Sequence, residues 1–182
     1  RRNPTDSFDL TLAEIEAREQ VYELWHFLRD NIPGFENSRV LSTAIQIGTR
    51  ESRMIDGEYC LTQEDLKNCV HFPDGIAAGN YDIDIHSPEG SGTSHYFFAP
   101  GTWYTIPYRC LLPVGTKNLL VAGRCISSTH EAQASYRIMP IVCCIGEAAG
   151  TAAGVACRAH TSLRGVDVEQ VRAILKAGGA PI

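Results

Sequence analysis

The chain has 182 residues, of which 44% are hydrophobic and 20% charged, and its formal net charge at pH 7 is −5. This composition is typical of a soluble globular protein, and the negative charge argues against nucleic-acid binding, which needs a surface rich in Lys and Arg. The seven cysteines contain no Cys-x-x-Cys pair, so they indicate neither a disulfide framework nor a structural zinc site. We expect reduced, mostly buried thiols in a cytoplasmic protein.

The first residues, RRNPTDSF, contain no initiator methionine and no signal- or transit-peptide pattern. We therefore expect the sequence to start inside a longer polypeptide. A long amphipathic helix is predicted in TLAEIEAREQVYELWHFLRD, because Thr11 and Glu14 have capping-box spacing and apolar residues recur on one face. Pro33 and Gly34 should end it.

Two strands are expected next, in RVLSTAIQIG and RMIDGEYCLT, because β-branched and apolar residues alternate with polar ones. A short helix should follow, with Thr62 as its N-cap and Asp65 at the capping-box position.

The middle of the chain predicts further extended segments. NYDIDIH alternates apolar and polar residues, as a half-exposed strand does, and SPEGSGTSH has the composition of a loop. YTIPYRCLLP contains two prolines and should form an edge or irregular extended segment. NLLVA is a continuous apolar run, typical of a strand buried on both faces of a parallel sheet.

Two helices are expected at the end of the chain. One runs from about Arg137 to Arg158 with Pro140 in its first turn, where proline is tolerated. The other starts after Asp167 as N-cap and stops at two glycines. The pattern as a whole predicts an α/β or α+β fold with a mixed sheet and flanking helices.

The segment after NLLVA carries the strongest indication of a site, because ligands of α/β sheets bind where parallel strands end. Gly123 would let a ligand approach the backbone, and the guanidinium of Arg124 suits a phosphate or a carboxylate. Ser128 and His130 add polar groups. The N-terminal end of the following helix would favour an anionic or electron-rich group.

That helix carries Gly146, Gly150 and Gly154 at four-residue spacing. Each interior glycine costs about 1 kcal/mol relative to alanine, so a close approach of a ligand or another backbone is expected. The spacing alone leaves open tight helix packing without a ligand. It also occurs in membrane helix dimers, but the apolar run is short and contains Pro140 and Glu147, so we expect no membrane span.

The segment NLLVAGRCISSTHEAQASYRIMPIVCCIGEAAGTAAG resembles the C-terminal, flavin-contacting part of a family of FAD-dependent oxidoreductases. That family is distantly related to the flavoprotein subunits of succinate dehydrogenase and fumarate reductase. IGTRESRMIDGEYCLTQEDL, YDIDIH and YTIPYRCLLP resemble other segments of the family in the same order, so the resemblance covers about residues 39–159.

The resemblance implies FAD as cofactor, with the N-terminal end of the glycine-rich helix at the pyrimidine edge of the flavin. There the helix dipole would favour the charge of reduced flavin. It also implies an N-terminal helical segment (1–38), a substrate-side sheet region (39–115) and the C-terminal part of an FAD-binding domain (116–182). The candidate cofactor-binding residues are Gly123, Arg124, Ser128, Arg137, Met139, Gly146, Ala149 and Gly150.

Flavoproteins of this type hold the ADP half of FAD on an N-terminal βαβ unit with a G-x-G-x-x-G motif, and no such motif occurs in the sequence. We therefore expect the chain to be the C-terminal piece of a two-domain enzyme and to retain FAD weakly or not at all by itself. The complete enzyme would transfer hydride between flavin and an unidentified small organic substrate. The absent domain would leave an apolar surface through which the chain could self-associate.

Three residues are candidates for catalysis. His130 is the first choice for proton transfer, His86 is a second acid or base, and Arg50 could bind a substrate carboxylate. Each also has an ordinary structural explanation, such as a half-exposed strand histidine or a surface ion pair. No metal site is expected, because Asp82 and Asp84 have no further ligands at suitable spacing.

Two other functions remain open. The chain could be a non-catalytic binding or interaction module derived from such an enzyme. A dehydrogenase using a nicotinamide cofactor alone is disfavoured, because the sequence carries no dinucleotide fingerprint.

Overall fold

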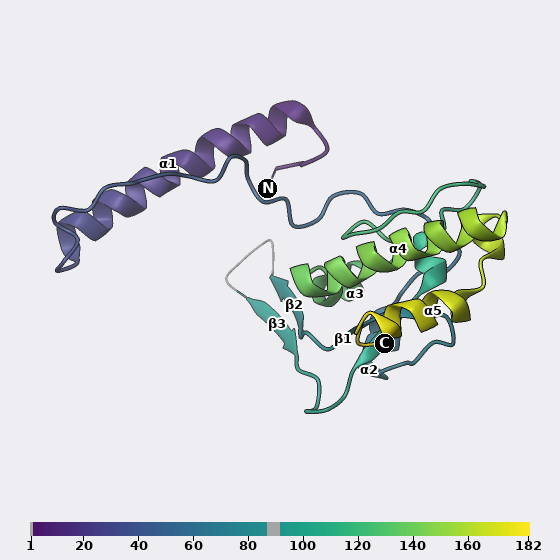
Figure 1. Ribbon diagram of the computed structural model, residues 1–182. Helices are drawn as coiled ribbons and strands as arrows, with labels where there is room; N and C mark the ends of the chain where they lie inside the picture. The colour runs from purple at the N-terminus through teal and green to yellow at the C-terminus, as the bar shows by residue number, and fades with distance from the viewer. Residues whose placement is uncertain (1, 87–91) are drawn as a thin grey trace. The chain divides into compact units, whose positions relative to one another are not determined.

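The computed structural model describes residues 2–86 and 92–182, with only the backbone of His86. The chain divides into two compact units, Arg1–Arg53 and Met54–Ile182 (Figure 1). It combines helices with small antiparallel sheets, which confirms the expected class of mixed helices and sheets. The division at residues 38 and 115 stays a prediction.

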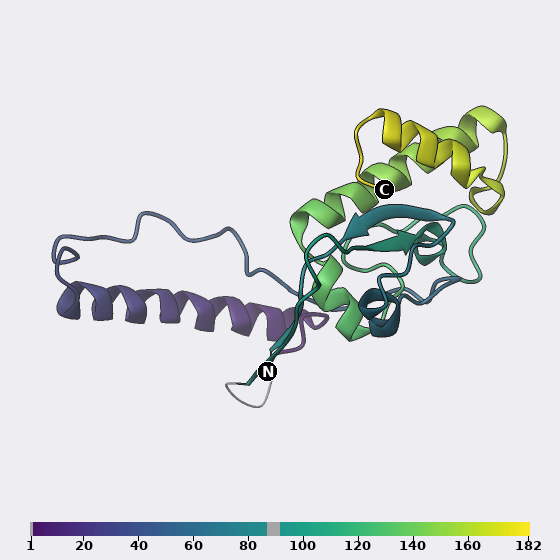
Figure 2. The same cartoon turned by 90° about the horizontal axis from the view of Figure 1, so that it is seen from below.

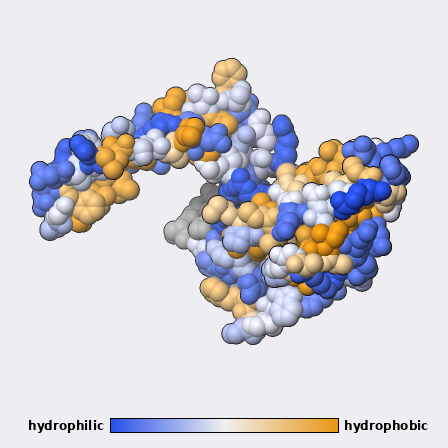
Figure 3. Space-filling model, in the orientation of Figure 1, coloured by the Kyte–Doolittle hydropathy of each residue, from blue (hydrophilic) through white to orange (hydrophobic). Residues whose placement is uncertain are grey.

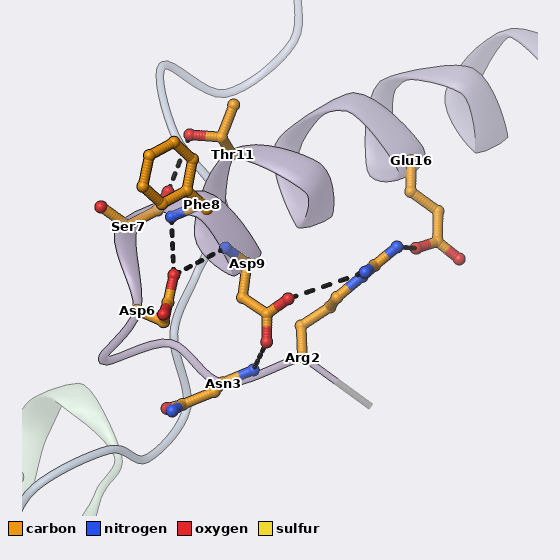
Figure 4. Close-up of polar contacts among 8 residues, drawn as sticks. All are labelled: Arg2, Asn3, Asp6, Ser7, Phe8, Asp9, Thr11 and Glu16. Carbon is orange, nitrogen blue, oxygen red and sulfur yellow. Dashed lines mark hydrogen bonds and ion pairs between the residues drawn. The ribbon is translucent and has the colours of Figure 1, made fainter.

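The first unit is built on helix α1, Ser7–Asn31. Its N-cap is Asp6, whose carboxylate accepts hydrogen bonds of 2.8 and 3.2 Å from two backbone N–H groups of the first turn (Figure 4). The capping box expected at Thr11 is therefore wrong. Thr11 lies inside the helix, where its hydroxyl donates to the carbonyl of Ser7 at 2.8 Å.

Residues 39–48 form no strand but run in extended conformation along α1 (Figure 1). The guanidinium of Arg18 donates to the carbonyl of Ile45 at 3.2 Å, and the carboxylate of Glu14 accepts a hydrogen bond from the N–H of Ile47. Backbone groups that a strand would use for a ladder are thus bonded to side chains of the helix. The prediction of a strand here was wrong for this reason.

The first unit has almost no buried core. Ala13 is its only buried residue among those described, and α1 carries orange apolar side chains on its surface in Figure 3. The most exposed large apolar side chains of α1 are Phe8, Ile15, Tyr22, Leu24 and Phe27.

The second unit contains two small antiparallel sheets. Strand β1 (Gly75–Gly79) pairs with β4 (Tyr104–Pro107), and β2 (Ile83–His86) pairs with β3 (Thr93–Tyr96). Its helices are α2 (Gln63–Lys67), α3 (His130–Tyr136), α4 (Met139–Ala159) and α5 (Val168–Ala177), with 3-10 turns at Tyr108–Leu111 and Leu163–Gly165.

The core of this unit lies between the β1–β4 sheet and the two long helices. Helices α4 and α5 pack against each other and against β1 (Figure 2), while α3 packs on β2. α4 contributes a stripe of buried residues at helical spacing, which removes apolar surface from water and stabilises the unit. The stripe consists of Ile141, Ile145, Ala148, Ala152 and Val155.

Elements with strong local signals occur where they were predicted. In α2 the Thr62 hydroxyl accepts from the N–H of Asp65 at 3.2 Å, and the Asp65 carboxylate accepts from the N–H of Thr62 at 2.9 Å, a complete capping box. Pro140 lies in the first turn of α4, and Asp167 caps α5.

Elements that need a partner strand differ from the prediction. Residues 53–62 make only isolated bridges, Gly57 to Pro113 and Leu61 to Ser128. NLLVA forms no strand: within the described part of the chain no ladder runs beside it, and Leu119 is 49% exposed. An apolar run alone cannot supply the neighbouring strands that a parallel sheet requires.

The segment expected to be a loop contains part of a strand, and the polar segment after NLLVA contains a helix. Of SPEGSGTSH, residues 87–91 lie outside the described residues, whereas Thr93–His95 belong to β3. The segment after Cys125 forms α3, because Thr129 caps the helix by accepting from the N–H of Ala132 at 3.3 Å. The helix then buries Tyr136 completely.

Gly79→Ala should destabilise the second unit by about 1–3 kcal/mol, the usual cost of overpacking a core. A Cβ at this position would lie 2.6 Å from the Tyr104 hydroxyl and 2.7 Å from Ile141 Cδ1. Gly154→Ala is the control, because the nearest atom there, Arg158 Nη1, is 3.6 Å away. Urea denaturation measures the stability of both variants. Equal unfolding midpoints for Gly79→Ala and Gly154→Ala would contradict the tight contact at Gly79.

Stability should fall as pH rises above about 9, because burial raises the pKa of the Cys110 thiol to about 12 from 9.0. The unfolded thiol loses its proton first, so this contribution is complete below pH 9 and disappears as pH approaches 12, at up to about 1.4 kcal/mol per pH unit. Cys110→Ala should flatten the decline between pH 9 and 10 in denaturation series. A slope identical to that of the wild type would show that Cys110 is not the group responsible.

Candidate functional site

A buried tyrosine, Tyr136, holds the loop between NLLVA and α3 in place. The Tyr136 hydroxyl is 2.8 Å from Ser128 Oγ and donates to the carbonyl of Arg124 at 3.2 Å. Ser128, expected to bind a cofactor, is only 9% exposed, and its hydroxyl also contacts the sulfur of Met54 at 3.2 Å. Ser128 therefore positions the loop from inside the unit.

The outer side of this loop presents different groups. Gly123 has φ +106°, a left-handed conformation that favours glycine, and a Cβ there would meet no atom within 4 Å. Arg124 and His130 are exposed on the same stretch of chain. The loop thus combines an open backbone position with a cationic side chain and an imidazole.

Gly146, Gly150 and Gly154 form a glycine stripe on α4, and its first two members face outward. Gly146 and Gly150 are exposed, and a Cβ at either would meet no atom within 4 Å beyond the helix itself. Met139, at the start of the helix, is 81% exposed. Close packing inside the described part of this chain therefore does not explain these two glycines, and the face is open to a large flat group.

A cavity of about 670 Å³ lies beside α4, on the side of the NLLVA segment. Ala149 and Ala153 of the helix line it together with Leu119 and Leu120. Ala149, a predicted cofactor-binding residue, therefore borders a hollow that is lined mainly by apolar side chains, with Asn118, His160 and Thr161 among its polar residues.

A charged cluster adjoins the N-terminal end of α4. Arg137, the residue after α3, places Nη2 3.1 Å from Asp84 Oδ2. His95 on β3 places Nδ1 2.8 Å from Asp82 Oδ2 and Nε2 3.7 Å from Asp84 Oδ1. Asp84 is 8% exposed, so it belongs to a partly buried network.

Sequence reasoning did not single out His95, because the antiparallel register that brings it opposite Asp84 is not visible in the chain. The alternation of acidic residues in YDIDIH and the histidine of the following strand were the available signals. Among the described residues, no group of three or more His, Cys, Asp or Glu side chains could hold a metal ion.

The other two candidate catalytic residues are His86 and Arg50. His86 ends β2 opposite Thr93, and its side chain lies outside the described part of the structure. Arg50 is exposed in the first unit and borders a cavity of about 270 Å³ there, together with Ala13 and Ile47. Their catalytic roles stay predictions.

α4 is the one helix among the described residues that is long and apolar enough to cross a membrane. The core helix of a soluble protein can meet the same criteria, and one face of α4 is buried against β1 and α5. The absence of a membrane span stays a prediction.

Tyr136→Phe should destabilise the second unit by about 1–3 kcal/mol, because it removes a buried hydroxyl that bonds Ser128 and the carbonyl of Arg124. Tyr96→Phe is the control, since Tyr96 is exposed and its hydroxyl donates a long hydrogen bond, of 3.5 Å, to the carbonyl of Lys67. Thermal or urea unfolding distinguishes the two variants. A Tyr136→Phe protein as stable as Tyr96→Phe would show that the loop is held by other contacts.

Comparison with known proteins identifies the family. A family model described as FAD dependent oxidoreductase matches residues 1–175. No curated protein and no solved structure was found to match the chain. Because the match spans nearly the whole chain, including the loop at Gly123 and the glycine stripe of α4, the chain belongs to the FAD-dependent oxidoreductase family.

Proposed function

We propose that the loop at Gly123–Arg124 and the open glycine face of α4 form the flavin-facing wall of an oxidoreductase that transfers hydride between an organic substrate and FAD. The observation that carries the proposal is the exposure of Gly146 and Gly150, with no atom within 4 Å of a Cβ at either. Glycine in a helix interior costs about 1 kcal/mol of stability relative to alanine. The described residues make no close contact at Gly146 or Gly150 that would require glycine there.

The residues at this face fit a large anionic cofactor. Arg124 is an exposed residue whose guanidinium suits the pyrophosphate, and Gly123 leaves the backbone accessible. At the start of α4 the N-cap residue Ile138 supplies no side-chain hydrogen bond, so the N–H groups of the first turn and the positive end of the helix dipole suit an electron-rich group. When bound, flavin would accept or donate the hydride.

The remaining candidate residues take supporting roles in this proposal. Arg137 lies just before α4, Met139 is its first residue, and Ser128 fixes the loop through Tyr136. Ala149 borders the apolar hollow along the helix. Residues outside these 182 would hold the ADP half of FAD, so this chain alone should bind FAD weakly. A distant relation to the succinate dehydrogenase and fumarate reductase flavoproteins is part of the same proposal.

Gly146→Leu tests the proposal, because it should affect the cofactor and not the fold. In this chain the variant should be as stable as the wild type or up to about 1 kcal/mol more stable, because leucine is a better helix former and the position is open. In a longer polypeptide that includes a dinucleotide-binding unit, the same change should reduce the flavin retained after reconstitution with FAD by at least tenfold, measured by visible absorbance.

Gly154→Ala is the matched control, two turns further along α4, and should retain flavin. If the longer wild-type protein binds no flavin after reconstitution, the proposed function is wrong and a non-catalytic module becomes the better explanation. If Gly146→Leu retains flavin fully, the assignment of this helix face is wrong.

A further inference from the structure

We propose that His95 is the proton-transferring residue of the reaction, with Asp82, Asp84 and Arg137 as its positioning residues; this inference rests on the proposed function. The four side chains come from neighbouring positions in the fold. Asp84 and His95 are directly opposite each other in the β2–β3 pair, Asp82 precedes β2, and Arg137 connects α3 to α4.

The contact with Asp82 sets the tautomer of the imidazole. His95 Nδ1 lies 2.8 Å from Asp82 Oδ2, and a carboxylate can only accept a hydrogen bond, so Nδ1 carries the proton. In the neutral ring Nε2 then holds a lone pair and can accept a proton. A base oriented by a carboxylate through its other nitrogen is the arrangement that general-base catalysis requires.

Asp84 supplies a counter-charge for the protonated ring. Its Oδ1 is 3.7 Å from His95 Nε2, close enough to stabilise an imidazolium by charge without capturing Nε2 in a hydrogen bond. Arg137 Nη2 fixes the same carboxylate through Oδ2 at 3.1 Å. Both partners are largely shielded from solvent, with side-chain exposures of 17% for Arg137 and 11% for Asp84, so the ion pair restricts their motion.

The imidazole itself remains accessible. The His95 side chain is 38% exposed and stacks at 5.6 Å on the ring of Phe97, which is 74% exposed. Arg137 joins this cluster to the first turn of α4, where the proposal above puts the flavin. An accessible base beside an exposed aromatic ring is suited to an organic substrate.

His95 can serve as the base in the oxidation of an alcohol or an amine. Oxidised FAD, when bound, would supply the acceptor for the hydride that leaves the substrate C–H bond, and the O–H or N–H proton would pass to His95 Nε2. A C=O or C=N bond forms in the product. In the reverse direction His95 returns the proton, so the same group serves oxidation and reduction.

The orientation of the ring can be measured in this chain without flavin. Nitrogen NMR of the neutral imidazole should show His95 protonated at Nδ1, and Asp82→Asn should weaken that preference, because the amide offers an NH2 donor as well as an acceptor. Asp74→Asn is the matched control, because Asp74 pairs with Arg109 at 2.9 Å outside the cluster and should leave the His95 signals unchanged. A neutral His95 protonated at Nε2 in the wild type would overturn the inference.

The link to the flavin can be measured without a known substrate, using dithionite as reductant in the flavin-bound longer protein. Reduced flavin is anionic and favours a protonated neighbour, so the wild type should take up more protons per flavin reduced than His95→Gln near neutral pH, measured with a pH indicator in weak buffer. His71→Gln should behave as the wild type, since His71 stacks on Trp103 and its Nε2 meets a backbone carbonyl at 3.0 Å.

Equal uptake by His95→Gln and the wild type, with flavin bound in both, would refute the inference and leave the proposed function intact. A wild-type protein that binds no flavin would refute the proposed function, and the inference with it. Equal flavin content and equal unfolding midpoints in the two histidine variants would exclude a structural origin for any difference in uptake.

Discussion

The candidate site depends on the burial of α3, a helix of seven residues. Tyr136 and Ser135 point from its end into the unit and bond to three separate segments. Tyr136 reaches the loop at Ser128, and the Ser135 hydroxyl lies 2.7 Å from the hydroxyl of Tyr104 on β4 and donates to the carbonyl of Tyr81 before β2. Buried polar groups are costly unless each is satisfied, so these hydrogen bonds specify one arrangement of loop and strands.

Burial also keeps this network neutral. It raises the pKa of the Tyr104 phenol well above its ordinary value, so the hydroxyl stays protonated at neutral pH and can bond Ser135. The charged residues of the site do not belong to this hydrogen-bond network: Arg124 is exposed, whereas Arg137 and Asp84 pair with each other and are largely shielded from solvent. The unit thus has a neutral network that holds the backbone and a separate charged cluster that includes the more accessible His95.

The parts of the fold that could be predicted are those with local causes. The capping box of α2, the proline in the first turn of α4 and the Asp167 cap of α5 act over three or four residues, and all three occur as expected. The strands in 39–48 and in NLLVA failed because a strand is defined by its neighbour, which periodicity does not reveal.

The candidate site was predictable to the same extent and for the same reason. The open backbone at Gly123 and the glycine spacing of α4 follow from single residues, whose requirements can be stated without a partner. His95 can be recognised as a candidate only from the strand register, which places it opposite Asp84 and close to Asp82. Side chains that acquire a role through pairing need the three-dimensional structure.

The two faces of α4 carry separate demands. Ile145, Ala148 and Ala152 are buried and belong to the core, while Gly146 and Gly150 on the opposite side contribute no core packing. A helix that served only the core would gain stability from alanine at both glycines. Glycine at these positions lowers the stability of the helix but leaves no side chain on its surface. A helix with small residues on both faces can lie close to the sheet on one side and to a flat cofactor on the other. In the proposed function the constraint on this helix is its thickness, which the buried alanines limit on one side and the exposed glycines on the other.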